Sequence, residues 1–386
     1  MNPAEQARTP HQPFVVAHAR GDHWGLAAKA CLETLAGQPA NVGFLYVTEA
    51  FNQNLSSILT FLRETTRIPH WVGAVVPTVI AGDEALGEGG ALAVMTGLLP
   101  EDGFRAFWGL EAEEIATRLR PWLDSHGPCL GLAHGDSRSP GVAALLQALA
   151  AQVGSLTGGL VSSSGPPAQL ADSVVSGGIA GLLVGAEVPV VTGLTQGCTP
   201  IGPLRRVTAG AEGVIMSLDG RPALDVLKQD AGQLIARDIR RASGYIHLAV
   251  PVAGSDSGDS DAGDYMVRML LGVDPRQGWL AVGDRIDEGA QVMFVRRDPQ
   301  SARADMERML ADVSFRLAGR PVRAAFYFSC VGRGGHMFGE DDREVAMIRE
   351  ALGPVPLIGF FGHGEFSGDR LYGFTGVLAV LAGERP

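Results

Sequence analysis

The fold is decided by a stretch near the C-terminus, made of residues 324–328 (AAFYF), 342–351 (DREVAMIREA), 356–365 (PLIGFFGHGE) and 376–381 (GVLAVL). Two apolar runs lie on either side of one helical stretch, as expected for a crossover connection onto a sheet. The last two runs are joined by Gly-rich, polar residues, which is typical of an antiparallel excursion. The stretch therefore predicts a strand, a helix and two further strands.

The same order occurs twice earlier in the chain. The first copy comprises residues 41–46 (NVGFLY), 55–66, 70–76 (HWVGAVV) and 91–95 (ALAVM), and the second comprises 129–133 (CLGLA), 141–152, 156–164 (LTGGLVSSS) and 179–184. A repeated supersecondary unit determines the architecture. The predicted fold class is therefore α/β, with mixed β-sheets flanked by helices and built from recurring strand–helix–strand–strand units.

One glycine recurs inside the middle strand of each copy, at Gly73, Gly158 and Gly359. Glycine weakens a strand interior unless a bulge or a close approach requires it. Two interpretations stay open: the sheets approach each other or a ligand at these positions, or each glycine marks a β-bulge.

A different segment, residues 188–298, separates the second copy from the third. It contains a turn signal at Asp219-Gly220 and a predicted helix over 223–236. Residues 254–264 (GSDSGDSDAGD) predict an exposed polar loop rather than a calcium loop, because their spacing lacks the required Gly and Glu. We predict a flexible tail over 1–12, an N-terminal domain over 13–235 and a C-terminal domain over 236–386.

Composition narrows the class of protein. The chain has 386 residues, with 31 Lys and Arg against 42 Asp and Glu, a formal net charge of −11. An acidic surface disfavours nucleic acid and anionic lipid as partners. Four scattered cysteines form no disulfide framework or zinc motif. Because the N-terminus lacks a secretory pattern and no apolar window is long enough to span a bilayer, we expect a cytoplasmic protein without membrane insertion.

The most pointed motif is residues 329–335 (SCVGRGG), directly after a predicted strand. A Gly-rich turn between a strand and a helix presents backbone N–H groups to an anion. Met337 stands where the dinucleotide fingerprint needs a third Gly, and the Gly-Lys-Ser/Thr of a phosphate loop is missing. Arg333 is a candidate clamp for a carboxylate; the alternative is a Gly-rich turn with a solvated arginine.

Cys330, in the same motif, has two interpretations. It is either a packed core residue or a thiolate activated by Arg333, with His336 or His363 as a nearby base. The second alternative makes the protein a thiol-dependent enzyme.

Two other loops carry candidate side chains. In the 362–365 stretch (GHGE), glycines flank His363, and Glu365 is a candidate acceptor for an amine. The 134–138 stretch (HGDSR) occupies the corresponding place in the second copy, where turn-stabilising roles for His134 and Asp136 are favoured over metal binding or acid–base work.

Five stretches together resemble the FIST-domain proteins: TQGCTPIGP (195–203), LDGRPALDVL (218–227), YMVRMLLGVDP (265–275), FSCVGRGG (328–335) and PLIGFFGHGEF (356–366). This family carries a FIST N module and a FIST_C module, and the C-terminal block is also similar to the FIST region of a eukaryotic F-box protein. Matched by position, the recurrent family residues here are Gln196, Gly197, Cys198, Pro200, Arg268, Cys330, Gly332, Arg333, Gly334, Gly359, Gly364 and Glu365.

The resemblance implies a bacterial sensory module that binds a small, amino-acid-like ligand and signals through a separate partner, such as a histidine kinase. Arg333 would then hold a carboxylate and Glu365 an amine, in a pocket where the 330–333 loop, the 359–365 strand and residues 196–200 converge. A non-enzymatic role is favoured and no metal is expected. The resemblance leaves a haem-binding nitric oxide sensor as an alternative, with His18, His134, His247 or His363 as axial ligand.

Overall fold

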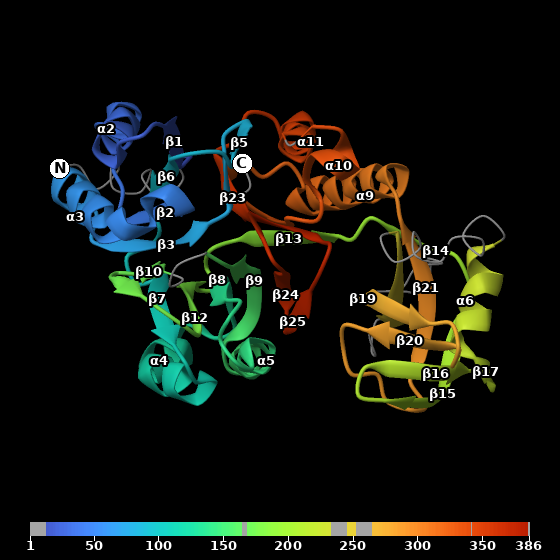
Figure 1. Ribbon diagram of the computed structural model, residues 1–386. Helices are drawn as coiled ribbons and strands as arrows, with labels where there is room; N and C mark the ends of the chain where they lie inside the picture. The colour runs from blue at the N-terminus through green and yellow to red at the C-terminus, as the bar shows by residue number, and fades with distance from the viewer. Residues whose placement is uncertain (1–12, 164–167, 233–244, 252–264, 341, 385–386) are drawn as a thin grey trace. The chain divides into compact units, whose positions relative to one another are not determined.

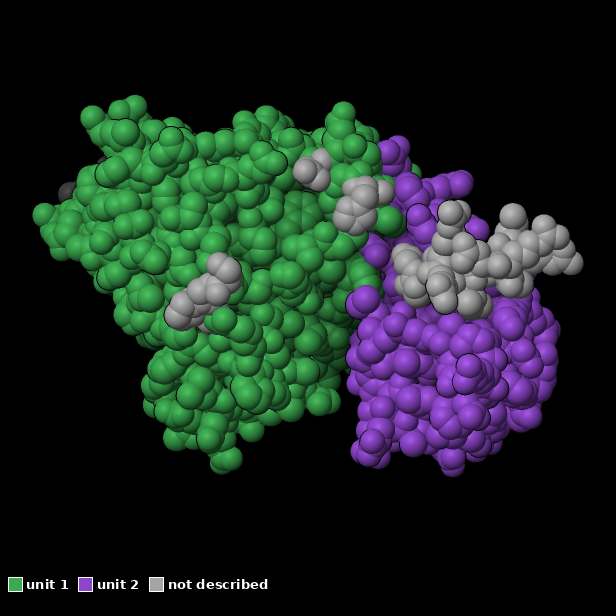
Figure 2. Space-filling model, in the orientation of Figure 1, with its two compact units in different colours: residues 1–195, 306–386 green, residues 196–305 purple. Residues whose placement is uncertain are grey.

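The computed structural model describes residues 13–163, 168–232, 245–251, 265–340 and 342–384. It has a mixed α/β architecture with helices outside the sheets, which confirms the predicted fold class. The chain forms two compact units, residues 1–195 with 306–386 (unit 1) and residues 196–305 (unit 2), coloured separately in Figure 2. Among the helices that the structure describes, none has the length and apolarity needed to cross a membrane.

Unit 1 contains the three predicted copies. They comprise β2 (Val42–Thr48), α3 (Leu55–Thr66), β3 (His70–Val76) and β6 (Ala91–Gly97); β8 (Cys129–Asp136), α5 (Val142–Val153), β9 (Gly154–Val161) and β12 (Ile179–Val184); and β22 (Val322–Cys330), α11 (Arg343–Leu352), β23 (Leu357–Gly362) and β26 (Gly376–Ala382). In each copy the first two strands are parallel and the last strand is antiparallel to the first.

Each copy is longer than predicted, because a strand and a helix precede it. These are β1 (Val15–Arg20) with α2 (Trp24–Leu35), β7 (Phe104–Gly109) with α4 (Ala112–His126), and β13 (Val190–Thr195) with α9 (Pro299–Leu317). The extra strand pairs antiparallel with the closing strand of its own copy. Figure 1 shows the resulting helix pairs against their sheets, α2 with α3 and α4 with α5.

The copies are interlocked by exchanged hairpins. The hairpin β4 (Thr78–Ala81) with β5 (Glu84–Leu86) pairs with β23; β10 (Gln169–Ala171) with β11 (Val174–Val175) pairs with β3; and β24 (Glu365–Gly368) with β25 (Arg370–Tyr372) pairs with β9. Each of the three six-stranded sheets is therefore completed by another copy. The exchange is cyclic, so no copy has a complete sheet alone.

The core of unit 1 lies between the inner faces of the three sheets. Phe44, Leu132 and Phe326 occupy corresponding positions of the three first strands and are all buried in one cluster. The outer faces of two sheets bury against their own helices in separate clusters. Because both faces are covered, the central strands β2, β6, β12 and β26 are buried along their whole length and read as continuous apolar runs.

The recurrent strand glycines are explained by a close approach between neighbouring strands. A Cβ atom on Gly73, Gly158 or Gly359 would lie 1.7–1.8 Å from a carbonyl oxygen of the parallel strand beside it. The register around all three is regular, so the β-bulge interpretation is wrong. The approach is within a sheet, to the first strand of the same copy, rather than between sheets or to a ligand.

Unit 2 is inserted in the third copy, after β13, and it ends inside the N-terminal part of α9. It comprises β14 (Cys198–Pro200), β15 (Arg205–Ala211), β16 (Val214–Leu218), β17 (Arg221–Pro222), α6 (Ala223–Ala231), β18 (Ile246–Pro251), β19 (Tyr265–Asp274), β20 (Trp279–Val282) and β21 (Gln291–Arg297). Pairing runs β21–β15–β16–β20–β19–β18 and returns to β21, which closes the sheet on itself. The predicted turn at Asp219-Gly220 joins β16 to β17, with φ of 49° and 74°.

Three predictions fall on residues outside the described ranges: the tail over 1–12, the polar loop over 254–264 and the boundary at residue 235. The division into 13–235 and 236–386 thus stays a prediction. The compact units divide the chain at other positions, because residues of both predicted domains, 13–235 and 236–386, contribute to unit 1.

Candidate functional site

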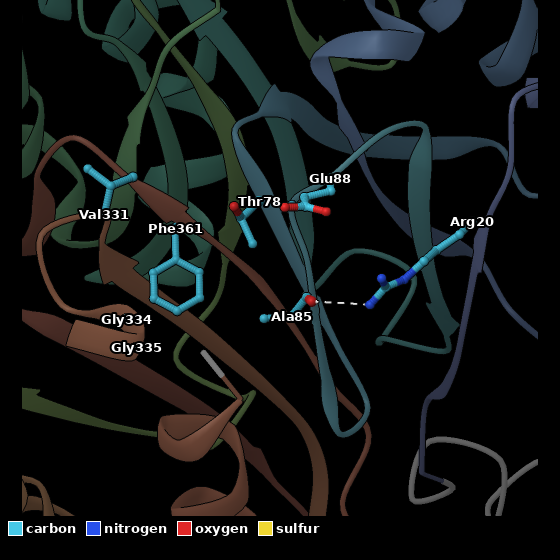
Figure 3. A pocket seen from close by; sticks show the side chains of 9 residues that line it. Arg20, Thr78, Ala85, Glu88, Val331, Gly334, Gly335 and Phe361 are labelled. Carbon is cyan, nitrogen blue, oxygen red and sulfur yellow. Dashed lines mark hydrogen bonds between the residues drawn. The ribbon is translucent and has the colours of Figure 1, made fainter. Parts of the chain in front are cut away.

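A pocket lies on unit 1 where the 331–335 loop approaches the carboxyl end of β23. Its volume is about 300 Å³, and it is lined by Arg20, Thr78, Ala85, Gly87, Glu88, Val331, Gly334, Gly335 and Phe361 (Figure 3). The loop and the strand were both predicted to form the site. The rest of the wall comes from the exchanged β4–β5 hairpin and the end of β1, which sequence reasoning missed because these segments are remote in the chain.

The pocket wall carries charges of both signs. The Arg20 guanidinium donates from Nη2 to Glu84 Oε2 at 3.3 Å and to the Ala85 carbonyl at 3.4 Å, the contact marked in Figure 3. Glu88 is exposed, and Thr78 lies beside the preceding Gly87, because a Cβ on that glycine would meet Thr78 Oγ1. Phe361 supplies an apolar surface. Such a wall suits a small ligand with both cationic and anionic groups.

Arg333 is in the same loop but faces the interior. Its side chain is 1% exposed, and Nε donates to Glu344 Oε1 at 2.8 Å. Nη1 donates to the Thr195 carbonyl at 3.4 Å, and the guanidinium lies over the Phe338 ring. The interpretation as a solvated arginine is wrong. Since its partner carboxylate is internal, a role in clamping a ligand carboxylate would require Arg333 to leave Glu344, and that role stays a prediction.

Glu344, on the buried face of α11, accepts further hydrogen bonds. Tyr327 Oη donates to Oε1 at 2.6 Å, and Ser329 Oγ lies 3.1 Å from Oε2. The corresponding faces of α3 and α5 bury only apolar side chains. We refer to Tyr327, Ser329, Arg333, Glu344, Glu365 and Thr375 as the buried polar network.

Glu365 completes this network from the exchanged hairpin. It is fully buried, and its Oε2 accepts from Thr375 Oγ1 at 2.6 Å and from Thr375 N at 3.3 Å. Oε1 has no hydrogen-bond partner among the described residues. Desolvation raises the pKa of Glu365 to about 8, against the opposing effect of the Thr375 hydrogen bonds and of Arg333, while Glu344 raises it further. The role of Glu365 as the acceptor for an amine stays a prediction.

The network is peculiar to the third copy. The residue paired with the strand glycine is Leu45 in the first copy, Ala133 in the second and Tyr327 in the third. Two positions further on, Ser329 corresponds to Val47 and Gly135. The fold therefore accepts apolar residues at these positions. Buried charge carries a desolvation penalty, and in the third copy that penalty is offset by the hydrogen bonds around Glu344.

The remaining predicted residues of this region have the following environments. Cys330 is 6% exposed, which fits the packed alternative, and its N–H donates to the Thr375 carbonyl. A Cβ on Gly332 would lie 3.0 Å from the Phe374 ring, so this glycine permits close packing. His363 is exposed, while Gly359 and Gly364 are buried.

Gln196, Cys198 and Arg268 belong to unit 2 and make contacts there. Gln196 Nε2 donates to the Tyr265 carbonyl at 2.5 Å, and Tyr265 Oη donates to the Cys198 carbonyl at 2.9 Å. Arg268 pairs with Asp284 at 2.5 Å. The Tyr265–Cys198 bond joins β19 to β14 within unit 2, and a ligand role for Gln196, Cys198 and Arg268 stays a prediction.

The candidate haem ligands occupy different environments. His134 is fully buried in β8, with Nε2 2.8 Å from Tyr46 Oη, and desolvation lowers its pKa to about 3. Burial and then Arg297 lower the pKa of His247 to about 4. His18 lies 3.6 Å from Glu84. Haem binding stays a prediction, which the visible absorption spectrum after haem addition would test.

For the 134–138 stretch, the predicted turn-stabilising role is confirmed for Asp136. Asp136 Oδ1 accepts from Arg138 N at 2.8 Å, which is a turn-stabilising bond. His134, in contrast, lies inside the strand rather than in the turn. With Tyr46 and Phe328, its counterparts in the other copies, it forms an aromatic contact at the centre of unit 1.

Comparison with known proteins places the chain in a family. The FIST N domain matches residues 41–221 and the FIST C domain matches residues 223–368. Together the two domains cover most of the chain, which therefore belongs to the FIST family. FIST domains are associated with sensory signal transduction.

Relatives occur in mycobacteria. An uncharacterized protein of Mycobacterium tuberculosis is 35% identical over 216 residues, which are 52% of this chain and 53% of the relative, so the match spans about half of that protein. An uncharacterized protein of Mycobacterium bovis is 29% identical over 380 residues, which are 92% of this chain and 94% of the relative.

Proposed function

We propose that this chain is a sensory protein that binds a small, amino-acid-like ligand in the pocket of unit 1 and signals through a separate partner protein, such as a histidine kinase. The observation that carries the proposal is a pocket of about 300 Å³ with Arg20, Glu88 and Thr78 on its wall. This volume is at the lower end of the range for small-molecule sites. The family association with sensory signal transduction supports the same conclusion.

We propose other residues for the ligand-binding roles than those that the sequence suggested, because Arg20 and Glu88 line the pocket. Arg20 takes the carboxylate, because a guanidinium matches the planar geometry of that group. Glu88 takes the amine, since its side chain is exposed on the pocket wall. Phe361 packs against the apolar part of the ligand.

Calorimetry with a panel of the protein amino acids tests this proposal. We expect millimolar or tighter binding of at least one member, and an affinity loss of about tenfold or more in Glu88→Gln and in Arg20→Gln, because each removes one charge-assisted contact. Glu33→Gln and Arg120→Gln are matched controls, since both side chains are exposed on helices away from the pocket lining. Absence of binding across the panel, or equal losses in the controls, would contradict the proposal.

A further inference from the structure

The 331–335 loop has one side on the pocket and the other on the buried polar network. Val331, Gly334 and Gly335 line the pocket, as Figure 3 shows. Arg333 lies between them, but its side chain is 1% exposed, and Nε donates to Glu344 Oε1 at 2.8 Å. The position of this part of the pocket wall is therefore fixed from inside unit 1 through one side chain.

The same guanidinium contacts the point where the chain leaves unit 1. Arg333 Nη1 donates to the carbonyl oxygen of Thr195 at 3.4 Å. Thr195 is fully buried at the end of β13 and is the last residue of unit 1 before unit 2 begins. Its carbonyl belongs to the planar peptide group that joins Thr195 to Gln196. The bond therefore restrains the first peptide group of the crossing into unit 2.

The point where the chain returns to unit 1 borders the network as well. Met306 is the first residue of unit 1 after unit 2, and its Sδ lies 3.8 Å from Tyr327 Oη. That hydroxyl donates to Glu344 Oε1 at 2.6 Å, and Arg333 donates to the same oxygen. Glu344 thus connects the pocket loop with both crossing points through direct contacts.

A glycine lets these groups approach one another. Gly376 in β26 pairs with Thr195 of β13 on one side and with Ser329 of β22 on the other. A Cβ on Gly376 would lie 2.2 Å from Tyr327 Oη and 3.1 Å from Thr195 Cγ2. Only glycine therefore leaves room for the Tyr327 hydroxyl beside the end of β13.

The polar contacts occur in the copy that carries the insertion. In the other copies β1 leads through a short connection into α2 and β7 into α4, whereas β13 leads into unit 2. The residues that correspond to Tyr327 in those copies are Leu45 and Ala133, which have no hydroxyl. The network thus accompanies the insertion, which supports a role at the crossing points.

We infer that Arg333 couples the pocket to the crossing between the two units. It joins the pocket loop to Glu344 and to the Thr195 carbonyl, so a displacement of the loop changes the restraint on the crossing. The coupling acts equally in the other direction, as linkage requires. Arg333 is a positioning residue that does not itself line the pocket. The inference rests on the proposed function, which it deepens by making unit 2 the part that responds to the ligand.

A double-mutant cycle followed by hydrogen exchange tests the coupling without a ligand. Asp305→Ala loosens the crossing, because Asp305 Oδ2 accepts from Gln196 N at 2.6 Å and from Gly197 N at 3.3 Å. Arg333→Lys keeps the positive charge but replaces the guanidinium fork by a single ammonium group. We expect Asp305→Ala to accelerate exchange of residues 331–335 several-fold in the wild-type background. The same change should have no effect on this loop in the Arg333→Lys background.

Two controls separate the coupling from a general loss of stability. Asp284→Ala breaks the ion pair with Arg268 elsewhere in unit 2 and should leave exchange of the 331–335 loop unchanged. The corresponding loop of the first copy, η2 (Glu49–Asn54), should not respond in any variant. An equal response of the 331–335 loop to Asp284→Ala would show that the effect is not carried by the crossing.

A 331–335 loop that does not respond to Asp305→Ala overturns the inference, as does an acceleration of the same size in the Arg333→Lys background. Where Arg333→Lys does not fold, Tyr327→Phe takes its place, because it removes the hydroxyl beside the return point and the other copies are apolar there. The acceleration should then be smaller than in the wild type, and an undiminished one overturns the inference. Failure of the amino-acid panel would refute the proposed function and leave this cycle unaffected.

Discussion

At the scale of single residues, the site is distinguished by charges that the fold does not need. Arg333 and Glu344 are both almost completely buried, so each charge carries a desolvation penalty that a surface charge does not. Replacing such pairs by apolar residues is often neutral or stabilising in other proteins, while removing one partner is strongly destabilising. The faces of α3 and α5 that correspond to the Glu344 face of α11 bury apolar side chains only.

The stability of the chain should depend on the proton of Glu365. The group holds its proton in the folded state up to a pH of about 8, whereas the unfolded carboxyl releases it near 4.5. The folded state thus binds more protons in this window, and stability falls as pH rises through it, by up to roughly 1.4 kcal/mol per unit. Glu365→Gln should match the wild type at low pH and be more stable near pH 8 in urea titrations. A stability difference that stays constant across the window would contradict this assignment.

At the scale of elements, sequence periodicity predicted the parts that a copy makes by itself. The runs around Gly73, Gly158 and Gly359 gave the strands and helices in order, because a buried parallel strand has a local apolar signature. The exchanged hairpins were not predictable, since β4 pairs with β23 across most of the chain and no local pattern specifies that partner.

The candidate site was likewise predictable only where its residues lie in a local sequence pattern. The 329–335 motif and the Gly359 strand were found because a Gly-rich turn after a strand is visible in the sequence. Arg20 and Glu88 were missed, since only the hairpin exchange brings them to that turn. Glu344 was missed because an acidic residue in the first turn of a helix usually faces solvent and favours the helix dipole.

Gly359→Ala tests the close approach of strands β22 and β23. An added Cβ would lie 1.7 Å from the Tyr327 carbonyl oxygen, and rigid backbone on both sides cannot yield without breaking the ladder. We expect a loss of roughly 3 kcal/mol or more in the free energy of unfolding. Gly373→Ala is the matched control, because no atom lies within 4 Å of its added Cβ. Equal stability of the two variants in denaturant titrations would refute the steric account.

At the scale of the whole molecule, unit 1 is made of three copies, and none of them has a complete sheet of its own. Each sheet receives its hairpin from another copy, so removing any copy exposes an edge in a second one. Unit 2 has its own closed sheet and its own apolar cluster. Unit 2 is inserted within the third copy, between Thr195 at the end of β13 and Met306 in α9, which both belong to unit 1.

This architecture predicts that unit 2 can be deleted and an exchanged hairpin cannot. The chain leaves unit 1 after Thr195 and returns at Met306, and the neighbouring Gln196 N–H donates to Asp305 Oδ2 at 2.6 Å, so the two crossing points are close enough for a short Gly-Ser linker. Replacing residues 196–305 with such a linker should leave a protein with a single cooperative unfolding transition. Deleting the β4–β5 hairpin should instead abolish that transition, since it unpairs β23 and removes Val79, Ala81 and Leu86 from the central core. Circular dichroism and thermal melts distinguish the outcomes. A folded hairpin deletion, or an unfolded linker variant, would show that the two compact units are not the folding units of the chain.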